Sequence, residues 1–253
     1  MSKSIAIIAG VGPGTGAAIA RQFASNYPVV LLSRKPENYE PLVKELKDAG
    51  KDAFGVSTDV SDSSSVKSCI EAVKKQYGND VKAAAAIYNA SGGFVRKPFL
   101  ELTEADLEGS WAGTVKGAFN FTQAVLPLLT PASASATPPK ESHGPPTLIF
   151  TGATASVKGS ANFSIFAAPK FAVRAMSQSL AREYGPKGVH VAHAIIDGVI
   201  DIPRTKEWAL PEGGKIRPEG IAEAYWWLHG QDRTGVDLGG GLEAGNREVV
   251  RRE

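Results

Sequence analysis

The sequence predicts a single α/β domain, in which helices cover both faces of a doubly wound (Rossmann) parallel sheet. Three observations predict this fold. Short apolar segments alternate with helical patterns along the chain, as parallel strands joined by crossover helices require. The first apolar segment runs directly into a glycine-rich turn and a helical pattern. The 253 residues, 43% of them hydrophobic, suit one large buried core. We therefore expect residues 1–253 to form one Rossmann-type domain.

Six segments have the apolar composition of buried strands. In chain order they are Ile5–Ala9, Val29–Ser33, Ala53–Thr58, Ala83–Tyr88, Thr147–Thr151 and Val189–Ile196. Helical patterns lie near residues 15–25, 37–49, 62–77, 103–129, 166–185 and 221–228. Pro169 lacks an N–H and fits best in the first turn of a helix, so we expect the helix near 166–185 to begin late.

The turn after the first strand has the composition of a dinucleotide cradle. Residues 5–16 read IAIIAGVGPGTG, and Gly10, Gly14, Thr15 and Gly16 stand where the strand gives way to the helix. Glycine can adopt positive φ and lets a ligand approach the backbone closely. The unpaired N–H groups at the helix N-terminus suit a pyrophosphate. The turn therefore predicts a dinucleotide site.

Two segments differ in composition from the rest. Residues 131–146 read PASASATPPKESHGPP, and we expect a surface insertion at the amino-terminal edge of the strands, away from any ligand. The tail, residues 234–253, contains three consecutive glycines and ends in charged residues, so we expect it to fray.

Composition argues against several other classes of protein. The net charge is +2 and its signs are interspersed, so no nucleic-acid partner is expected. No apolar run is long enough to span a membrane, and no cluster has metal-ligand spacing. The single cysteine, Cys69, fits a reducing compartment. The apolar strand near the amino terminus leaves no room for a leader peptide, and we expect a cytoplasmic location.

The spacing Gly10-x-x-x-Gly14-x-Gly16 resembles the cofactor loop of the short-chain dehydrogenase/reductase family. Five further motifs of that family follow in order to about residue 228. They are Asp59-Val60, Asn89-Ala90-Ser91, the run from Gly117 to Gln123, Phe166-x-x-x-Lys170 and Asp197-Gly198. The resemblance implies that Asp59 and Val60 hold the adenine ring, that Asn89 lies beside the cofactor, and that Lys170 binds the nicotinamide ribose.

The end of the second strand predicts the choice of cofactor. NAD-specific sites usually carry Asp or Glu there, whereas this chain has Ser33-Arg34-Lys35. No carboxylate repels a 2′-phosphate, and a guanidinium can bind it in bidentate fashion. We therefore expect NADP(H).

The resemblance also shows an altered catalytic site. The family uses a Tyr four residues before the Lys, a Ser thirteen residues before that Tyr, and an Asn on the long helix. Those positions fall on Phe166, Ala153 and Thr114. Of the family's catalytic set, only Lys170 remains.

Three interpretations stay open. Hydride transfer persists with another proton donor or an acceptor that needs none; or the protein binds nucleotide without turnover; or the pocket catalyses a non-redox dehydration, isomerisation or cyclisation. A neutral carbonyl needs an acid within reach, whereas an iminium accepts hydride without one. The candidate replacement donors are Asp197, Ser156, Ser164, Tyr88 and Asp201.

The resemblance further implies a substrate pocket and a subunit interface. Residues 203–217 stand where the family folds a lid over a small-molecule substrate, so Trp208 and Leu210 are expected to line an apolar pocket together with Ala153 and Phe166. Family members commonly pair through their two long helices, which predicts a homodimer or homotetramer.

Overall fold

One parallel sheet forms the centre of the molecule. The computed structural model describes residues 4–130, 143–231 and 241–243. Seven strands lie in the order β3-β2-β1-β4-β5-β6-β9, and every neighbouring pair is parallel. Their bounds are β1 Ser4–Ala9, β2 Val29–Ser33, β3 Ala53–Ser57, β4 Lys82–Tyr88, β5 Thr147–Thr151, β6 His190–Asp197 and β9 Gly241–Glu243. This arrangement confirms the predicted α/β fold.

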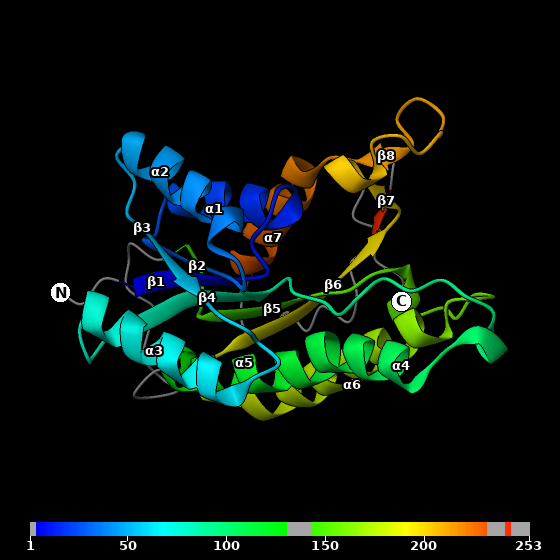
Figure 1. Cartoon of the computed structure of the whole chain (residues 1–253). Helices are drawn as coiled ribbons and strands as arrows, with labels where there is room; N and C mark the ends of the chain where they lie inside the picture. The colour runs from blue at the N-terminus through cyan, green and yellow to red at the C-terminus, as the bar shows by residue number, and fades with distance from the viewer. Residues whose placement is uncertain (1–3, 131–142, 232–240, 244–253) are drawn as a thin grey trace.

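Helices cover both faces of the sheet, as Figure 1 shows. On one face lie α1 (Thr15–Ala24), α2 (Glu40–Asp48) and α7 (Pro218–His229); on the other lie α3 (Ser63–Tyr77), α4 (Glu104–Trp111), α5 (Gly117–Leu129) and α6 (Ser164–Tyr184). Ala6 and Ile8 of β1 belong to the core beneath the first set, and Ile5 and Ile7 belong to the core beneath the second. Because both faces are buried, the strands are apolar at nearly every position.

The strand order places the ligand edge of the sheet. From β1 the chain moves outward through β2 to β3 and then returns to β4 on the opposite side of β1. Ligands of such sheets bind outside the carboxyl ends of the strands, where the order reverses. The turns after β1 and β4 therefore flank the expected binding crevice.

The segment predicted as one helix over residues 103–129 is interrupted by a π turn at Ala112–Lys116. The turn lets the backbone at Gly113 approach the loop after β4, where a Cβ would lie 2.8 Å from Gly92 Cα. The hydroxyl of Tyr88 donates to the Gly113 carbonyl at 2.7 Å, and Thr114 Oγ1 accepts from the Gly92 N–H at 2.9 Å. These contacts join the π turn to β4 and to the loop that follows it.

Helix α6 corrects one prediction. It begins at Ser164 and contains Pro169 in its interior, whereas the proline predicted a later start. The carbonyl of Ile165, which Pro169 cannot bond, instead accepts from the hydroxyl of Ser110 at 2.9 Å. A tertiary hydrogen bond thus replaces the missing helical one.

The tail corrects another prediction. Residues 241–243, expected to fray, form β9 beside β6. Residues 232–240 and 244–253 lie outside the described residues, as do residues 131–142 of the expected insertion. At the end of that insertion, His143 stacks on Trp226 with ring centroids 4.1 Å apart, and its N–H donates to the Tyr27 hydroxyl. Tyr27 precedes β2, so this contact lies at the amino-terminal edge of the sheet.

Between β6 and α7 the chain rises beyond the sheet. Two short strands, β7 (Val199–Ile200) and β8 (Lys215–Ile216), pair in parallel there. The hydroxyl of Thr205 donates to the Ile200 carbonyl, and Lys215 Nζ donates to the Thr205 carbonyl at 2.8 Å. These bonds fix the base of the segment expected to act as a lid.

Candidate functional site

The glycine turn adopts a backbone that other residues disfavour. Gly10 has φ +87° and Gly14 has φ +127°. A Cβ on Gly10 would lie 2.4 Å from Ala90 N, and one on Gly14 would lie 2.5 Å from Ile202 Cγ2. A Cβ on Gly16 would lie 2.5 Å from the Gly10 carbonyl oxygen, so this glycine lets α1 pack tightly against the turn.

The residues of the turn fit a dinucleotide. No side chain caps the N-terminus of α1, where the buried Thr15 begins the helix, so the first amides face the crevice without a side-chain partner. The amides of Gly10 and Val11 both donate to the Leu32 carbonyl at 3.0 Å. The turn therefore lies beside the end of β2 and the residues that follow it.

Arg34 stands exposed just beyond β2. Within the described residues its guanidinium forms no ion pair, whereas Lys35 lies 3.8 Å from Glu37. The hydroxyl of Ser33 accepts from Asn38 Nδ2 at 3.0 Å, which orders the start of this loop. An uncompensated guanidinium beside the glycine turn fits a 2′-phosphate.

Asp59 and Val60 lie at the carboxyl end of β3, as predicted. Asp59 Oδ1 accepts from the backbone N–H and the hydroxyl of Ser61, so its carboxylate orders its own turn. Val60 is buried against Gly117, where a Cβ would lie 2.8 Å from Val60 Cγ2.

A chain of hydrogen bonds joins the glycine turn to α7. Asn89 Nδ2 donates to the Gly10 carbonyl at 3.0 Å, and Asn89 Oδ1 accepts from the Thr151 hydroxyl at 3.1 Å. That hydroxyl in turn accepts from the fully buried Tyr225 at 2.8 Å. The role of Tyr225 could not be predicted from the sequence, because a buried aromatic residue on a helix is typical of core packing.

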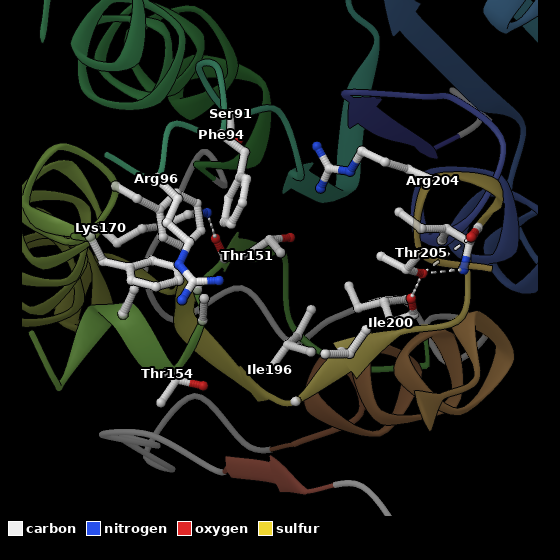
Figure 2. Close-up of a pocket in the computed structure, with 18 of the residues that line it drawn as sticks. Ser91, Phe94, Arg96, Thr151, Thr154, Lys170, Ile196, Ile200, Arg204 and Thr205 are labelled. Carbon is white, nitrogen blue, oxygen red and sulfur yellow. Dashed lines mark hydrogen bonds between the residues drawn. The ribbon is translucent and has the colours of Figure 1, made fainter. Parts of the chain in front are cut away.

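A cavity of about 730 Å³ opens beside these residues, within the usual size range of small-molecule sites. It brings together three predicted pocket residues, Ala153, Phe166 and Trp208, with Lys170 and Asn89. Figure 2 shows Thr151 and Lys170 at the same side of this cavity. Leu210 does not belong to its lining.

Lys170 is the buried cation of the cavity. Its side chain is 6% exposed, and its Nζ donates to the Thr151 carbonyl at 3.0 Å. Burial lowers the pKa of Lys170 to about 8, because the protein interior disfavours the charged form. Phe166, one helical turn earlier, offers it no polar partner.

The candidate proton donors occupy different places. Asp197 is exposed, and its Oδ1 accepts from the Thr154 hydroxyl at 2.5 Å. Thr154 itself lines the cavity. Ser156 is fully buried, accepts from the Ala153 N–H and does not line the cavity; nor do Ser164, Tyr88 and Asp201.

Apart from Phe166, sequence reasoning missed the aromatic cluster of the cavity and the two arginines that lie over it. Phe94, Phe163 and Phe166 form ring contacts at 5.1–6.4 Å between centroids. Arg96 lies over Phe163 at 5.4 Å, and Arg204 lies over Phe94 at 5.5 Å. Their place in the sequence could have indicated this role, because both arginines follow the carboxyl ends of strands, where ligands of such sheets bind.

The part of the chain that the structure describes contains no helix long and apolar enough to cross a membrane. In the same residues, no group of three or more His, Cys, Asp or Glu side chains is arranged to hold a metal ion.

The fold and the glycine turn define a Rossmann-type nucleotide-binding protein. A family model described as short chain dehydrogenase matches residues 4–212, so the chain belongs to the short-chain dehydrogenase/reductase family, whose members are oxidoreductases.

Similar proteins agree with this membership. A cis-4-hydroxycyclohexanecarboxylate dehydrogenase of Sinomonas cyclohexanicum is 27% identical over 238 residues, covering 90% of this chain and 89% of that protein. The structure of a short-chain dehydrogenase from Rhodopseudomonas palustris superimposes with a TM-score of 0.74 at 30% identity, covering 96% of this chain and 99% of that one. A short-chain dehydrogenase from Burkholderia cenocepacia, solved in complex with NADP, shares the fold with a TM-score of 0.75 at 22% identity, covering 94% of this chain and 95% of that one.

Proposed function

We propose that this protein is an NADP(H)-dependent oxidoreductase that transfers hydride to or from a small organic substrate. The observation that carries the proposal is the glycine turn, with Gly10 and Gly14 at positive φ, beside an Arg34 that forms no ion pair among the described residues. That set fits a phosphorylated dinucleotide. The Burkholderia cenocepacia structure with NADP supports the same choice of coenzyme.

Different residues around the crevice would bind different parts of the coenzyme. The α1 amides and Gly14 would face the pyrophosphate, Arg34 and Ser33 the adenosine phosphate, and Asp59 and Val60 the adenine ring. Asn89 holds the turn in place through its bond to Gly10, and Lys170 would bind the nicotinamide ribose. When bound, NADPH would supply the hydride for a carbonyl carbon of the substrate and would leave as NADP⁺.

The carbonyl oxygen must gain a proton as the hydride arrives, and Phe166 has none to give. We propose that the Thr154 hydroxyl passes its proton to the carbonyl oxygen while a protonated Asp197 donates its own proton to Thr154 Oγ1, which reverses the direction of the Thr154–Asp197 hydrogen bond described above. Thr154 lines the cavity and bonds Asp197, and Asp197 is open to solvent, from which it can be reprotonated. An iminium acceptor would need no proton from this pair, because hydride addition to it leaves no anion.

Phe166 also supports a second candidate function. An aromatic side chain at the position of the family's acid fits a protein that binds nucleotide for regulation without turnover, or one that catalyses a non-redox dehydration, isomerisation or cyclisation.

Two measurements test the proposal and separate these alternatives. Calorimetric titration should show NADPH binding more tightly than NADH, and stopped-flow absorbance should show NADPH consumption with a ketone, an enone or an imine. Binding without consumption of NADPH on any panel would favour the regulatory function. If neither NADPH nor NADH gave a heat of binding, the proposed coenzyme site would be rejected.

We also propose that the chain forms a homodimer or homotetramer through the face of α4, α5 and α6. Large apolar side chains are exposed there, with Trp111 at 41%, Phe119 at 50% and Phe171 at 43%. Monomeric proteins seldom expose such groups together. Light scattering of the purified protein measures the assembly directly.

A further inference from the structure

We propose that the substrate of this cavity carries a carboxylate on an apolar body, and that Arg96 and Arg204 bind that carboxylate. The inference rests on the proposed function only in treating the cavity as a substrate site. It is carried by the position, the packing and the uncompensated charge of the two arginines.

The two arginines come from different loops and meet at one cavity. Arg96 belongs to the loop between β4 and α4, and Arg204 to the segment between β7 and β8. Figure 2 shows both side chains extending toward the cavity from opposite sides. Each guanidinium lies over a phenylalanine ring of the same cluster. Contact with aromatic faces holds guanidinium planes beside an apolar wall while leaving their N–H donors free.

The charge of the cavity lining is one-sided. Lys158 also lines it, and none of the described lining residues is Asp or Glu. Arg96 and Arg204 form no ion pair among the described residues. Cations next to a low-dielectric wall attract an anion more strongly than cations in open water do. The cavity therefore favours a negatively charged ligand.

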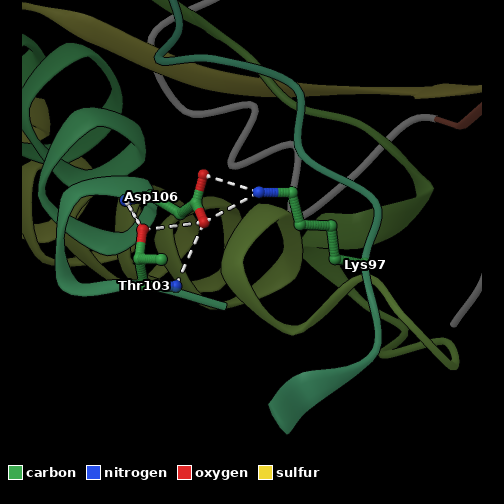
Figure 3. Close-up of polar contacts among 3 residues, drawn as sticks. All are labelled: Lys97, Thr103 and Asp106. Atoms are coloured by element: carbon green, nitrogen blue, oxygen red, sulfur yellow. Dashed lines mark hydrogen bonds and ion pairs between the residues drawn. The ribbon is translucent and has the colours of Figure 1, made fainter. Parts of the chain in front are cut away.

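The backbone beside each arginine is anchored. Next to Arg96, Lys97 bonds Asp106, which also accepts from the Thr103 N–H and hydroxyl at the start of α4 (Figure 3). The Lys97 N–H donates to the Asn162 carbonyl at 3.2 Å. Next to Arg204, the buried Thr205 bonds Ile200 and Lys215. The backbone that carries each guanidinium group is therefore held in place beside the cavity.

The chemistry of the donors favours a carboxylate over a phosphate. A planar guanidinium can bind a carboxylate or a phosphate in bidentate fashion, but phosphate sites commonly add backbone amides at a helix N-terminus. The amides of α1 would bind the coenzyme and lie outside this lining. The Phe94, Phe163 and Phe166 rings would contact the apolar body.

Calorimetry with three matched ligands tests the inference. They are 3-phenylpropanoate, its uncharged amide 3-phenylpropanamide, and 2-phenylethylphosphonate, each titrated with and without NADPH. We expect the carboxylate to bind about tenfold more tightly than the amide. We expect Arg96→Gln and Arg204→Gln each to remove most of that preference while leaving amide binding unchanged. Lys206→Gln, an exposed cation of the same loop outside the cavity lining, is the matched control and should retain the preference.

Equal binding of carboxylate and amide, or tighter binding of the phosphonate, would overturn the inference. So would an Arg204→Gln variant that loses NADPH affinity but keeps its preference for the carboxylate, because that arginine would then serve the coenzyme. A carboxylate preference in protein that binds no coenzyme would reject the proposed function and still support this anion site.

Discussion

The hydroxyl of Ser110 donates a hydrogen bond of 2.9 Å to the carbonyl oxygen of Ile165. The bond joins α4 to α6 at the point where Pro169 leaves that carbonyl without its helical donor. Ser110 is only 3% exposed, so water does not readily take its place. The start of α6, which carries Phe166, is therefore supported by the neighbouring helix.

Replacing Ser110 by Ala should lower the free energy of unfolding by about 1–2 kcal/mol, since a buried carbonyl then loses the hydroxyl that donates to it. In a Pro169→Ala background the new amide can bond Ile165, so the same substitution should cost about 1 kcal/mol less. Urea denaturation of the four proteins measures this coupling. An equal cost of Ser110→Ala in both backgrounds would contradict the account.

Pro169 also shows where the sequence falls short. A proline predicts a helix start because the missing N–H is normally harmless only there. The compensating donor lies 55 residues earlier in the chain, and no local pattern reveals it. The π turn at Ala112–Lys116 escaped prediction for the same reason, because contacts with Tyr88 and Gly92 stabilise it.

The strands and the glycine turn were predictable because their signals are local. An apolar run buried on both faces predicts the strand, and the glycines that follow it predict a turn with positive φ, all within one stretch of chain. The aromatic and cationic wall of the cavity was not predictable, since Phe94, Phe163 and Arg204 come together only through tertiary packing. β9 likewise depends on its pairing with β6.

Arg34 should determine the choice of coenzyme. Arg34→Leu removes the proposed partner of the 2′-phosphate, so we expect NADPH affinity to fall about ten- to a hundredfold, a typical loss for a charge-assisted bond. NADH affinity should hardly change. Lys35→Leu, which removes the adjacent cation, is the control and should have a much smaller effect. Calorimetry checks both; equal losses for NADPH and NADH would show that Arg34 does not bind the 2′-phosphate.

Lys170 should make stability depend on pH in the alkaline range. Burial lowers its pKa from 10.5 to about 8, so between these values the unfolded chain binds more protons than the native one. The native state is therefore stabilised as pH rises through this window, and the penalty of the buried charge is fully present below it. Lys170→Met lacks this dependence. The difference in unfolding free energy between the two proteins should change by about 3 kcal/mol across the window, in favour of the wild type at high pH.

Urea denaturation at several pH values measures that difference, and groups shared by both proteins cancel. Lys67→Met, at an exposed position on α3, is the control and should follow the wild type at every pH. Parallel pH curves for the wild type and Lys170→Met would contradict the buried, charged lysine.

Restoring the family's acid should increase ketone reduction. Phe166 and Ala153 both line the cavity with Lys170, so Phe166→Tyr combined with Ala153→Ser places two hydroxyls there. A positioned general acid contributes about a hundredfold or more to rate, and we expect a gain of that order in NADPH consumption with ketones. Phe163→Tyr adds a hydroxyl to the same aromatic cluster but not one turn before Lys170, and should give no gain. No gain in the double variant, with NADPH still bound, would indicate a repurposed pocket.

Asp197 should affect the rate of reduction only for substrates that must gain a proton. Asp197→Asn keeps the size of the side chain but removes the acid, so we expect carbonyl reduction to slow about a hundredfold while NADPH affinity stays unchanged. Thr154→Val should have the same effect, because Thr154 is the group that links Asp197 to the cavity. Reduction of a preformed iminium should continue at its original rate in both variants, since hydride addition leaves no anion.

Asp201→Asn, which changes an exposed acid outside the cavity lining, is the control. Equal loss of carbonyl and iminium reduction would show that Asp197 shapes the site without passing a proton, and wild-type rates in Asp197→Asn would place the donor elsewhere.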